Sequence, residues 1–362
     1  MGDNPLSDKA ILGFATVSND PSQVTSLPGR AEWPVRTAFS RGVVEKIRVG
    51  VVGVGALGQH HATVYASLPE ASLVGVADIL AGRAEQVARP LGVQSFTDYR
   101  HLLGQVDAVS IATPTSTHAD IGQQFLEQGV HVLVEKPISH SPEDADRLIQ
   151  TAARNGRVLQ VGHLERFNPA VRAVREIVTR PRFFEAHRMG LFSPRSLDID
   201  VILDLMIHDL DVIGLLVPSA PARIDAVGIP ILTDRIDIAN ARIQFADGCV
   251  ANITASRVSM EKIRKLRLFQ EREYISLDYS LQQAAIFQLA GGKDGGLPQI
   301  VGRRLEPSPA NPLADELRAF LAATQGRGPV ECTGQDGKRA LILALQILKQ
   351  AEKAQAVAFD RP

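Results

Sequence analysis

Short apolar runs alternate with longer segments of helical periodicity in the first half of the chain. The apolar runs are rich in β-branched residues, which is typical of strands buried on both faces of a parallel sheet. The predicted strands are Ile47 to Val52, Leu73 to Ala77, Ala108 to Ile111, Val130 to Val134 and Val158 to Val161. The predicted helices are Gln59 to Leu68, Ala119 to Gln128 and Ser141 to Asn155, the last with Ser141 as its N-cap. This alternation predicts a doubly wound parallel sheet of the Rossmann type, an α/β domain.

The pattern changes in the second half of the chain. Asp200 to Leu216 is predicted to be helical, whereas Ile236 to Leu289 alternates apolar and polar positions around the turn Ala246-Asp247-Gly248. Such alternation indicates a large, open, mainly antiparallel sheet with hairpins, so this half is predicted to be an α+β domain. The remaining predicted elements are a flexible loop at Gly291 to Gly296 and two closing helices, Leu313 to Ala323 and Lys338 to Lys353, which pack back on the core.

The chain is predicted to divide into three parts. Residues 1–44 are rich in Pro, Gly, Ser and Asn without periodicity, so they are expected to form a flexible extension. An alternative is an arm on a neighbouring subunit, with Trp33 as its anchor. Residues 45–165 are predicted to be the nucleotide-binding domain, and residues 166–362 the substrate-binding and oligomerisation domain.

A glycine-rich turn follows the first predicted strand. Gly53, Gly55 and Gly58, with Ala56 and Leu57 between them, form G-x-G-x-x-G and open a helix. Residues without a Cβ let backbone N–H groups approach a pyrophosphate, and the helix N-terminus adds roughly half a positive charge. We therefore predict that this turn binds the phosphates of a dinucleotide.

Asp78 ends the second predicted strand, twenty positions after Gly58. A carboxylate there accepts hydrogen bonds from the adenosine ribose hydroxyls, whereas a 2′-phosphate would be repelled by about 1 kcal/mol or more at ~4 Å. The sequence thus favours NAD over NADP as cofactor. Arg83, just downstream, is the residue that would soften this preference.

Composition narrows the class of protein. The 362 residues are 45% hydrophobic, enough for two cores, and a net charge of -1 without basic tracts argues against nucleic acid or an anionic membrane as partner. Cys249 and Cys332 lie outside any metal-binding spacing and are expected to be reduced and packed, as in the cytoplasm. No secretory signal is apparent. Charged residues interrupt the longest apolar stretch, Val201 to Val217, so no membrane span is predicted. No metal is predicted either.

Two polar turns follow buried strands of the predicted parallel sheet, where ligands of such sheets bind. The turn after the third strand carries the candidate cofactor ligands Thr113, Pro114, Thr115 and His118. After the fourth come Glu135, Lys136 and Pro137; burying a carboxylate and an ammonium without function would be costly, although a structural ion pair is the alternative. Pro137 is a candidate for a cis peptide bond.

A second constellation lies in the predicted helix after residue 200. Asp204 and His208 form D-x-x-x-H, which places both side chains on one helix face, so the carboxylate can orient the imidazole. An ordinary hydrogen-bonded pair is the alternative. His163, after the fifth strand, is predicted to line the substrate entrance.

In order and spacing, these motifs resemble the Gfo/Idh/MocA oxidoreductases. The resemblance covers roughly residues 46 to 356 and rests on GVGALG, Asp78, TPTSTH, EKP and D-x-x-x-H. It implies that Lys136 touches both nicotinamide and substrate, that Asp204 and His208 lie in a sugar site, and that the open sheet forms a homodimer or homotetramer. Arg166 and Asn168 match positions that approach substrate or cofactor, and the planar fork of Arg166 suits a diphosphate.

Within the family, three segments are most similar to bacterial UDP-N-acetylglucosamine 3-dehydrogenases of lipid A precursor synthesis: VGHLERFNPAV, DVILDLMIHDLD and DIANARIQFADGCVANITASR. The similarity implies a nucleotide-sugar substrate and a downstream aminotransferase. One departure is that Val201, Ile202 and Met206 stand where many members carry glycines, so a narrower pocket is expected. The alternatives are a dehydrogenase of a free sugar, inositol or uronic acid, and a non-catalytic NAD-binding regulator.

Oxidation of a secondary alcohol needs a base for the hydroxyl proton. Neutral His208, with a reference pKa near 6.5, is predicted to accept that proton, while Lys136 hydrogen-bonds the developing alkoxide and Asp204 aligns the ring. The alternative is that Lys136 itself is the base.

Overall fold

The computed structural model describes residues 46–192, 199–290, 299–305, 307–308 and 310–359. The predicted N-terminal extension at 1–44 and the predicted loop at Gly291 to Gly296 therefore lie outside the described residues. Among the described helices, none is long and apolar enough to cross a lipid bilayer.

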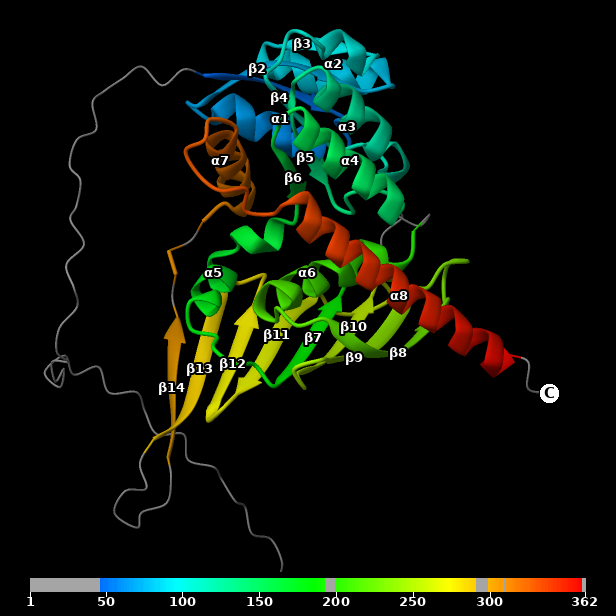
Figure 1. Ribbon diagram of the computed structural model, residues 1–362, viewed down its shortest axis with the longest axis vertical. Coiled ribbons are helices and arrows are strands. Elements are labelled where there is room, and N and C mark those ends of the chain that lie inside the picture. The colour runs from blue at the N-terminus through cyan, green and yellow to red at the C-terminus, as the bar shows by residue number, and fades with distance from the viewer. Residues whose placement is uncertain (1–45, 193–198, 291–298, 306, 309, 360–362) are drawn as a thin grey trace, which may run out of the picture. The chain divides into compact units, whose positions relative to one another are not determined.

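The first sheet is parallel and doubly wound, as predicted, with the strand order β3-β2-β1-β4-β5-β6 (Figure 1). Its strands are β1 (Ile47–Val52), β2 (Ala71–Ala77), β3 (Gln94–Phe96), β4 (Ala108–Ile111), β5 (His131–Glu135) and β6 (Leu159–Gly162). Its helices are α1 (Gly58–Ser67), α2 (Ala81–Leu91), α3 (His118–Glu127) and α4 (Pro142–Arg154). The strand order reverses between β1 and β4, so the crevice expected of such sheets lies at the carboxyl ends of these strands.

Local sequence explains most of these boundaries. The Ser141 hydroxyl accepts a hydrogen bond from the Asp144 N–H at 3.1 Å and so caps α4, as predicted. Around the parallel sheet, the strand and the helix that the sequence did not predict are β3, with only three residues, and α2, which contains Pro90 in its last turn. A short strand and a proline both weaken the local pattern.

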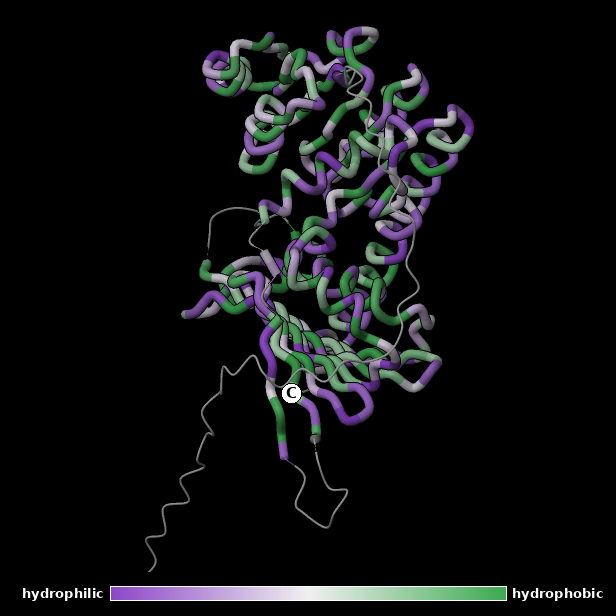
Figure 2. The backbone as a smooth tube through the Cα atoms, turned by 90° about the vertical axis from the view of Figure 1, so that its left-hand side faces the viewer, coloured by the Kyte–Doolittle hydropathy of each residue, from purple (hydrophilic) through white to green (hydrophobic). Residues whose placement is uncertain are grey.

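The second sheet has eight strands in the order β14-β13-β12-β11-β7-β10-β9-β8. They are β7 (Phe183–Met189), β8 (Pro221–Ile229), β9 (Ile238–Phe245), β10 (Val250–Ser256), β11 (Ile263–Gln270), β12 (Glu273–Asp278), β13 (Gln283–Ala290) and β14 (Gln299–Leu305). Only the β7–β10 pair is parallel, so the prediction of a mainly antiparallel sheet is confirmed. Buried and exposed residues alternate along β9, and Figure 2 shows the matching alternation of hydropathy along strands of this sheet.

Helices cover one face of the large sheet. They are α5 (Pro169–Arg175), α6 (Ile207–Leu216) and α8 (Gly334–Phe359), whereas α7 (Pro312–Thr324) packs against α1 in the first lobe (Figure 1). Leu341 of α8 lies in the core of the parallel sheet and Ile347 lies in the core of the large sheet. One helix therefore ties the two cores together. Short 3₁₀ turns occupy Tyr99–Leu102, Thr115–Thr117 and Leu164–Phe167.

The predicted helix from Asp200 to Leu216 requires a correction. Residues Ile202–Met206 form a π-helical turn, and the regular helix α6 begins only at Ile207. A π-helical turn requires no particular residue type, and this segment is apolar on nearly all sides. The spacing of its apolar residues therefore does not distinguish a π-helical turn from a regular α-helix. Such π turns often occur at functional sites.

Candidate active site

The glycine turn is shaped both by packing and by free space. A Cβ on Gly58 would lie 1.8 Å from the Gly53 carbonyl oxygen, and Gly53 itself has φ +81°. Both positions therefore require glycine for the backbone to fold this way. At Gly55, by contrast, a Cβ would meet nothing nearer than the Arg83 guanidinium at 3.9 Å. This open side of the turn fits the close approach of a pyrophosphate.

Asp78 lies where the sequence predicts it, at the carboxyl end of β2. Its carboxylate accepts hydrogen bonds from the N–H groups of Val54, at 3.1 Å, and Leu80, at 2.9 Å. Arg83 lies 3.5 Å from the same carboxylate. The acid is therefore fixed beside the glycine turn, in a position suited to the adenosine ribose of NAD.

The two polar turns meet through His118. Its ring nitrogens lie 2.9 Å from the carbonyl oxygens of Thr113 and Pro137, one in each turn. Burial lowers the pKa of this histidine, whose side chain is almost fully enclosed. His118 thus links the two turns on their buried side, while Pro114 and Thr115 at their surface remain candidate cofactor contacts. The Lys136–Pro137 peptide bond is cis, as the sequence analysis anticipated.

Glu135 is buried and points into the parallel-sheet core. It contacts His61 of α1 at 3.0 Å and accepts the Lys136 N–H at 3.2 Å. Glu316 of α7 is fully buried nearby, and polar atoms of His61, Glu135 and Glu316 all lie within 4.8 Å of one another. Sequence analysis missed this cluster; its only local signal is that Glu316 shares a helix face with Phe320.

The two carboxyl groups of this cluster differ in charge. Burial, and next the charge of Glu135, raise the pKa of Glu316 well above its usual range, so Glu316 is neutral at neutral pH. Burial opposes ionisation of Glu135 as well, but the hydrogen bond and charge of His61, with the charge of Lys136, lower its pKa overall. One proton therefore stays on Glu316, and Glu135 remains charged beside Lys136.

Lys136 connects the two lobes of the protein. Its ammonium donates a hydrogen bond to the Asp204 carbonyl oxygen at 2.7 Å and lies 3.4 Å from the Asp204 carboxylate. Asp204 belongs to the π-helical turn, so this contact brings the end of β5 against the second lobe. The prediction that Asp204 orients the His208 ring is not what the geometry shows, because the carboxylate pairs with Lys136 instead. The π turn breaks the regular i, i+4 spacing on which that prediction was based.

His208 lies at the start of α6, four residues after Asp204. Its Nδ1 is buried, and the imidazole makes no hydrogen bond with any residue in the described ranges. Burial first, and then the charges of Lys136, Arg188, His163 and Arg264, lower its pKa well below 6.5. The ring is therefore neutral at neutral pH and can accept a proton.

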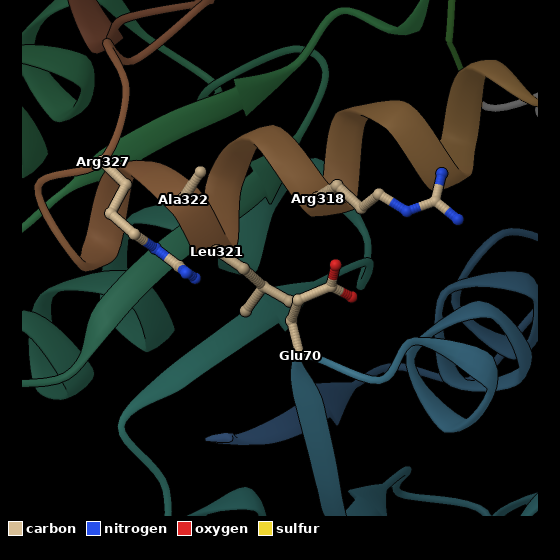
Figure 3. A pocket seen from close by; sticks show the side chains of 5 residues that line it. All are labelled: Glu70, Arg318, Leu321, Ala322 and Arg327. Carbon is tan, nitrogen blue, oxygen red and sulfur yellow. The ribbon is translucent and has the colours of Figure 1, made fainter. Parts of the chain in front are cut away.

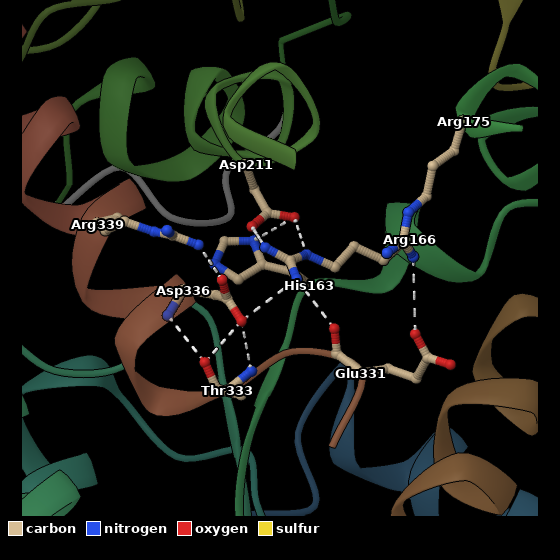
Figure 4. Close-up of polar contacts among 8 residues, drawn as sticks. All are labelled: His163, Arg166, Arg175, Asp211, Glu331, Thr333, Asp336 and Arg339. Carbon is tan, nitrogen blue, oxygen red and sulfur yellow. Dashed lines mark hydrogen bonds and ion pairs between the residues drawn. The ribbon is translucent and has the colours of Figure 1, made fainter. Parts of the chain in front are cut away.

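Arg166 and Asn168 have protein partners. The Arg166 guanidinium makes two hydrogen bonds to the Asp211 carboxylate, at 2.7 and 2.8 Å, and a third to the Glu331 carbonyl oxygen (Figure 4). Asn168 caps α5 through Ala170 and is 2% exposed. Both side chains are thus engaged in the structure, which leaves no free fork on Arg166 for a diphosphate.

His163 is enclosed between these groups and the candidate site. It is 1% exposed, and neither ring nitrogen has a hydrogen-bond partner among the described residues; Nδ1 lies 3.9 Å from the Asp211 carboxylate. Burial, rather than any of its charged neighbours, is the largest cause of its lowered pKa. A neutral, unpartnered imidazole at this place keeps His163 a candidate for contact with substrate.

A separate hollow of about 340 Å³ lies between α7 and Glu70, which directly precedes β2 (Figure 3). Arg318 and Arg327 also line it. It opens at the amino end of the parallel sheet, whereas ligands of such sheets bind at the carboxyl ends. We therefore do not assign the active site to this hollow.

Comparisons with known proteins agree with this geometry. The family described as "Oxidoreductase family, NAD-binding Rossmann fold" matches residues 47–163. UDP-N-acetylglucosamine 3-dehydrogenase from Acidithiobacillus ferrooxidans is 42% identical over 302 residues, which cover 83% of this chain and 96% of that enzyme. A solved structure of that enzyme superposes with a TM-score of 0.79 and 40% identity, covering 85% of this chain and 98% of the other.

More distant relatives share the fold. The scyllo-inositol 2-dehydrogenase (NAD(+)) of Bacillus subtilis is 33% identical over 59% of this chain and 68% of its own length. Levoglucosan dehydrogenase, solved in complex with NADH, superposes with a TM-score of 0.75 at 21% identity, covering 85% of this chain and 98% of the other; at that identity the likeness shows the fold alone.

The glycine turn, Asp78 and the Lys136 cluster on a Rossmann sheet define an NAD-dependent oxidoreductase with a second domain built on an open sheet. The chain belongs to the Gfo/Idh/MocA oxidoreductase family.

Proposed function

We propose that this protein oxidises the C3 hydroxyl of UDP-N-acetylglucosamine with NAD and forms the 3-keto sugar nucleotide. The observation that carries the proposal is the 2.7 Å hydrogen bond from Lys136 to Asp204, which brings the end of β5 to the helix that bears His208. The proposal is supported by the extent of similarity to the UDP-N-acetylglucosamine 3-dehydrogenase of A. ferrooxidans. The proposed setting is lipid A precursor synthesis, in which an aminotransferase would consume the ketone.

The chain's residues have distinct roles in the proposed reaction. The glycine turn and Asp78 would hold NAD, which would supply the acceptor for the hydride of the carbinol carbon. His208 takes the hydroxyl proton, because its imidazole is neutral and free of protein partners. Lys136 donates a hydrogen bond to the oxygen as negative charge develops there, and Asp204 holds the ammonium in place.

The proposed function is tested by incubating the full chain with NAD and UDP-N-acetylglucosamine. We expect absorbance of reduced cofactor at a rate dependent on enzyme, and a product lighter than the substrate by two hydrogens in mass spectrometry. Parallel incubations use scyllo-inositol, myo-inositol, glucose and glucuronate. Turnover confined to an inositol or a free sugar would replace the nucleotide sugar as the proposed substrate. No turnover of any alcohol would favour a non-catalytic NAD-binding regulator.

The choice of base is tested by single-turnover hydride transfer in two variants. We expect His208→Ala to slow hydride transfer by a factor of about 10² to 10⁴, the usual contribution of a general base. Lys136→Ala should also slow hydride transfer, whereas NAD affinity should change little in the His208 variant. Undiminished hydride transfer in the His208 variant would reject this assignment and point to Lys136.

We further propose that residues 45–165 and 166–362 act as cofactor and substrate domains of a cytoplasmic homodimer or homotetramer. Supporting features are the exposed apolar side chains on the last strands of the large sheet, among them Phe287, Ile300 and Val301. Light scattering on the purified full chain measures the oligomer directly. A monomer at micromolar concentration would contradict the assembly.

A further inference from the structure

Two arginines stand side by side on the helix-covered face of the large sheet. Arg264 of β11 is paired in register with Arg188 of β7, next to it in the sheet (Figure 1). Directly opposed residues of neighbouring antiparallel strands have Cβ atoms roughly 4.5 to 5.5 Å apart, and like charges there destabilise the sheet. The pair therefore needs negative charge nearby.

Glu165 and Asp209 supply that charge, but of the two arginines only Arg188 binds them directly. Arg188 is 2% exposed, and its guanidinium binds the Asp209 carboxylate at 2.6 and 3.2 Å and Glu165 at 3.0 Å. Arg264 is half-buried, and its guanidinium makes no hydrogen bond or ion pair with any residue in the part of the chain that the structure describes. Burial, and next the charge of Arg188, lower the pKa of the Arg264 guanidinium from its usual range. The charges of Glu165 and Asp209 partly offset this effect, but no carboxylate among the described residues contacts the guanidinium.

The unpaired guanidinium lies close to the proposed chemistry. Its charge is among those that lower the pKa of His208, whose helix α6 packs on β7. Two other candidate cations are already used or face elsewhere: Arg166 is held by Asp211, and Arg267 lies on the opposite face of β11, paired with Glu185. Arg264, next to Arg188, keeps its guanidinium donors free of the described residues on the helix-covered face of this sheet.

We propose that Arg264 binds the anionic end of the substrate, the diphosphate of a nucleotide sugar, and thereby sets the sugar ring against His208. This inference rests on the proposed function. The diphosphate is attached at C1, two bonds along the ring from the C3 carbinol, so one substrate molecule carries both the anionic group and the reacting hydroxyl on a single sugar ring. A guanidinium matches two phosphate oxygens at once, which is the contact that Arg264 leaves unmade in the protein.

The test measures binding of UDP and of inorganic pyrophosphate to the NAD-loaded full chain by calorimetry. Arg264→Gln should weaken both affinities by roughly tenfold to a hundredfold, the size expected for a charge-assisted contact. Arg264→Lys, which keeps the positive charge, should weaken the two affinities by a smaller factor. The matched control Arg267→Gln, on the exposed face of the same strand, should bind as the wild type does.

Two further readouts separate binding from a structural role. Arg264→Gln should raise KM for UDP-N-acetylglucosamine by a larger factor than KM for methyl N-acetylglucosaminide, which has no diphosphate. Its unfolding midpoint without ligand should equal or exceed that of the wild type, because the substitution removes a charge that is only partly offset. Wild-type affinity for UDP in this variant, or a lowered midpoint with both substrates equally impaired, would overturn the inference.

The outcomes also distinguish this inference from the proposed function. If UDP-N-acetylglucosamine is oxidised but Arg264→Gln binds UDP normally, only the role of Arg264 fails. If that sugar is not oxidised but pyrophosphate binding depends on Arg264, the anion site stands and the substrate assignment fails. A wild-type protein that binds neither anion overturns the site.

Discussion

Burial affects the ionisable side chains around Lys136 according to whether a partner compensates their charge. Arg188 and Arg166 stay charged because each is held by two hydrogen bonds to one carboxylate. His208 and Glu316 have no hydrogen-bond partner at their buried polar atoms, and both are neutral. The chemistry assigned to His208 thus follows from its isolation, since a neutral imidazole without a protein partner has a ring nitrogen free to accept a proton.

Glu316 should make the stability of the protein depend on pH. Its pKa is raised in the folded state, so the wild type is favoured below the unfolded glutamate pKa of about 4.3 and loses stability as pH rises through the folded value. Glu316→Gln carries no proton to lose. We therefore expect the free energy of unfolding of this variant, relative to wild type, to increase between pH 4 and pH 8.

Urea unfolding at several pH values measures this difference. The control is Glu352→Gln on α8, an exposed glutamate whose replacement should give the same difference at every pH. A flat difference for Glu316→Gln would show that the carboxyl group is already ionised in the folded protein.

At the scale of elements, two turns determine how the site is built. The glycine turn lets α1 start close to β1, and the π-helical turn brings Asp204 to Lys136. Each departs from regular geometry at the point where the proposed ligands approach. The regular strands and helices hold the two turns in position, and the two turns provide the proposed contacts with ligands.

Gly58→Ala should remove cofactor binding. The new Cβ would lie 1.8 Å from the Gly53 carbonyl oxygen, so the turn must open. We expect NAD affinity to fall more than tenfold in fluorescence titration. Gly82→Ala in α2 is the matched control, because nothing lies within 4 Å of its added Cβ, and it should bind NAD normally and gain up to about 1 kcal/mol of stability. Equal NAD affinity in both variants would contradict the tight-turn argument.

At the scale of the whole molecule, α8 couples the two cores. Leu341 packs with Val161 of the parallel-sheet core, and Ile347 packs in the core of the large sheet. Both are fully or almost fully buried. Loss of either side chain should therefore weaken a unit shared by both lobes.

Leu341→Ala and Ile347→Ala are each expected to cost about 2 to 5 kcal/mol, as for other large-to-small core substitutions. In scanning calorimetry both should lower the midpoint of one common unfolding transition. The exposed Glu352→Ala on the same helix should change stability by no more than about 0.5 kcal/mol. Two separate transitions, with only one of them shifted by each variant, would show that the lobes unfold independently.

The sequence by itself determined the parallel-sheet lobe and much of the large sheet. The strands β1 and β4 match the predicted residues, and Ser141 caps α4 as expected, because strand period, glycine turns and caps are local properties. The strand β7, its parallel pairing with β10, and the edge strands β8 and β14 were not predicted. Their residues carry weaker alternation, and pairing partners lie far away in sequence.

Only the tertiary structure decided which side chains meet. Lys136 and Asp204 are 68 residues apart, so their contact, and the loss of the expected pairing of Asp204 with His208, follow from how the lobes pack. The same holds for Arg166, for which the sequence predicted a diphosphate contact but which binds Asp211 in the structure. Arg264 is left without a partner for the same reason. Charge and residue type are written in the chain, but compensation of charge depends on neighbours that folding brings together.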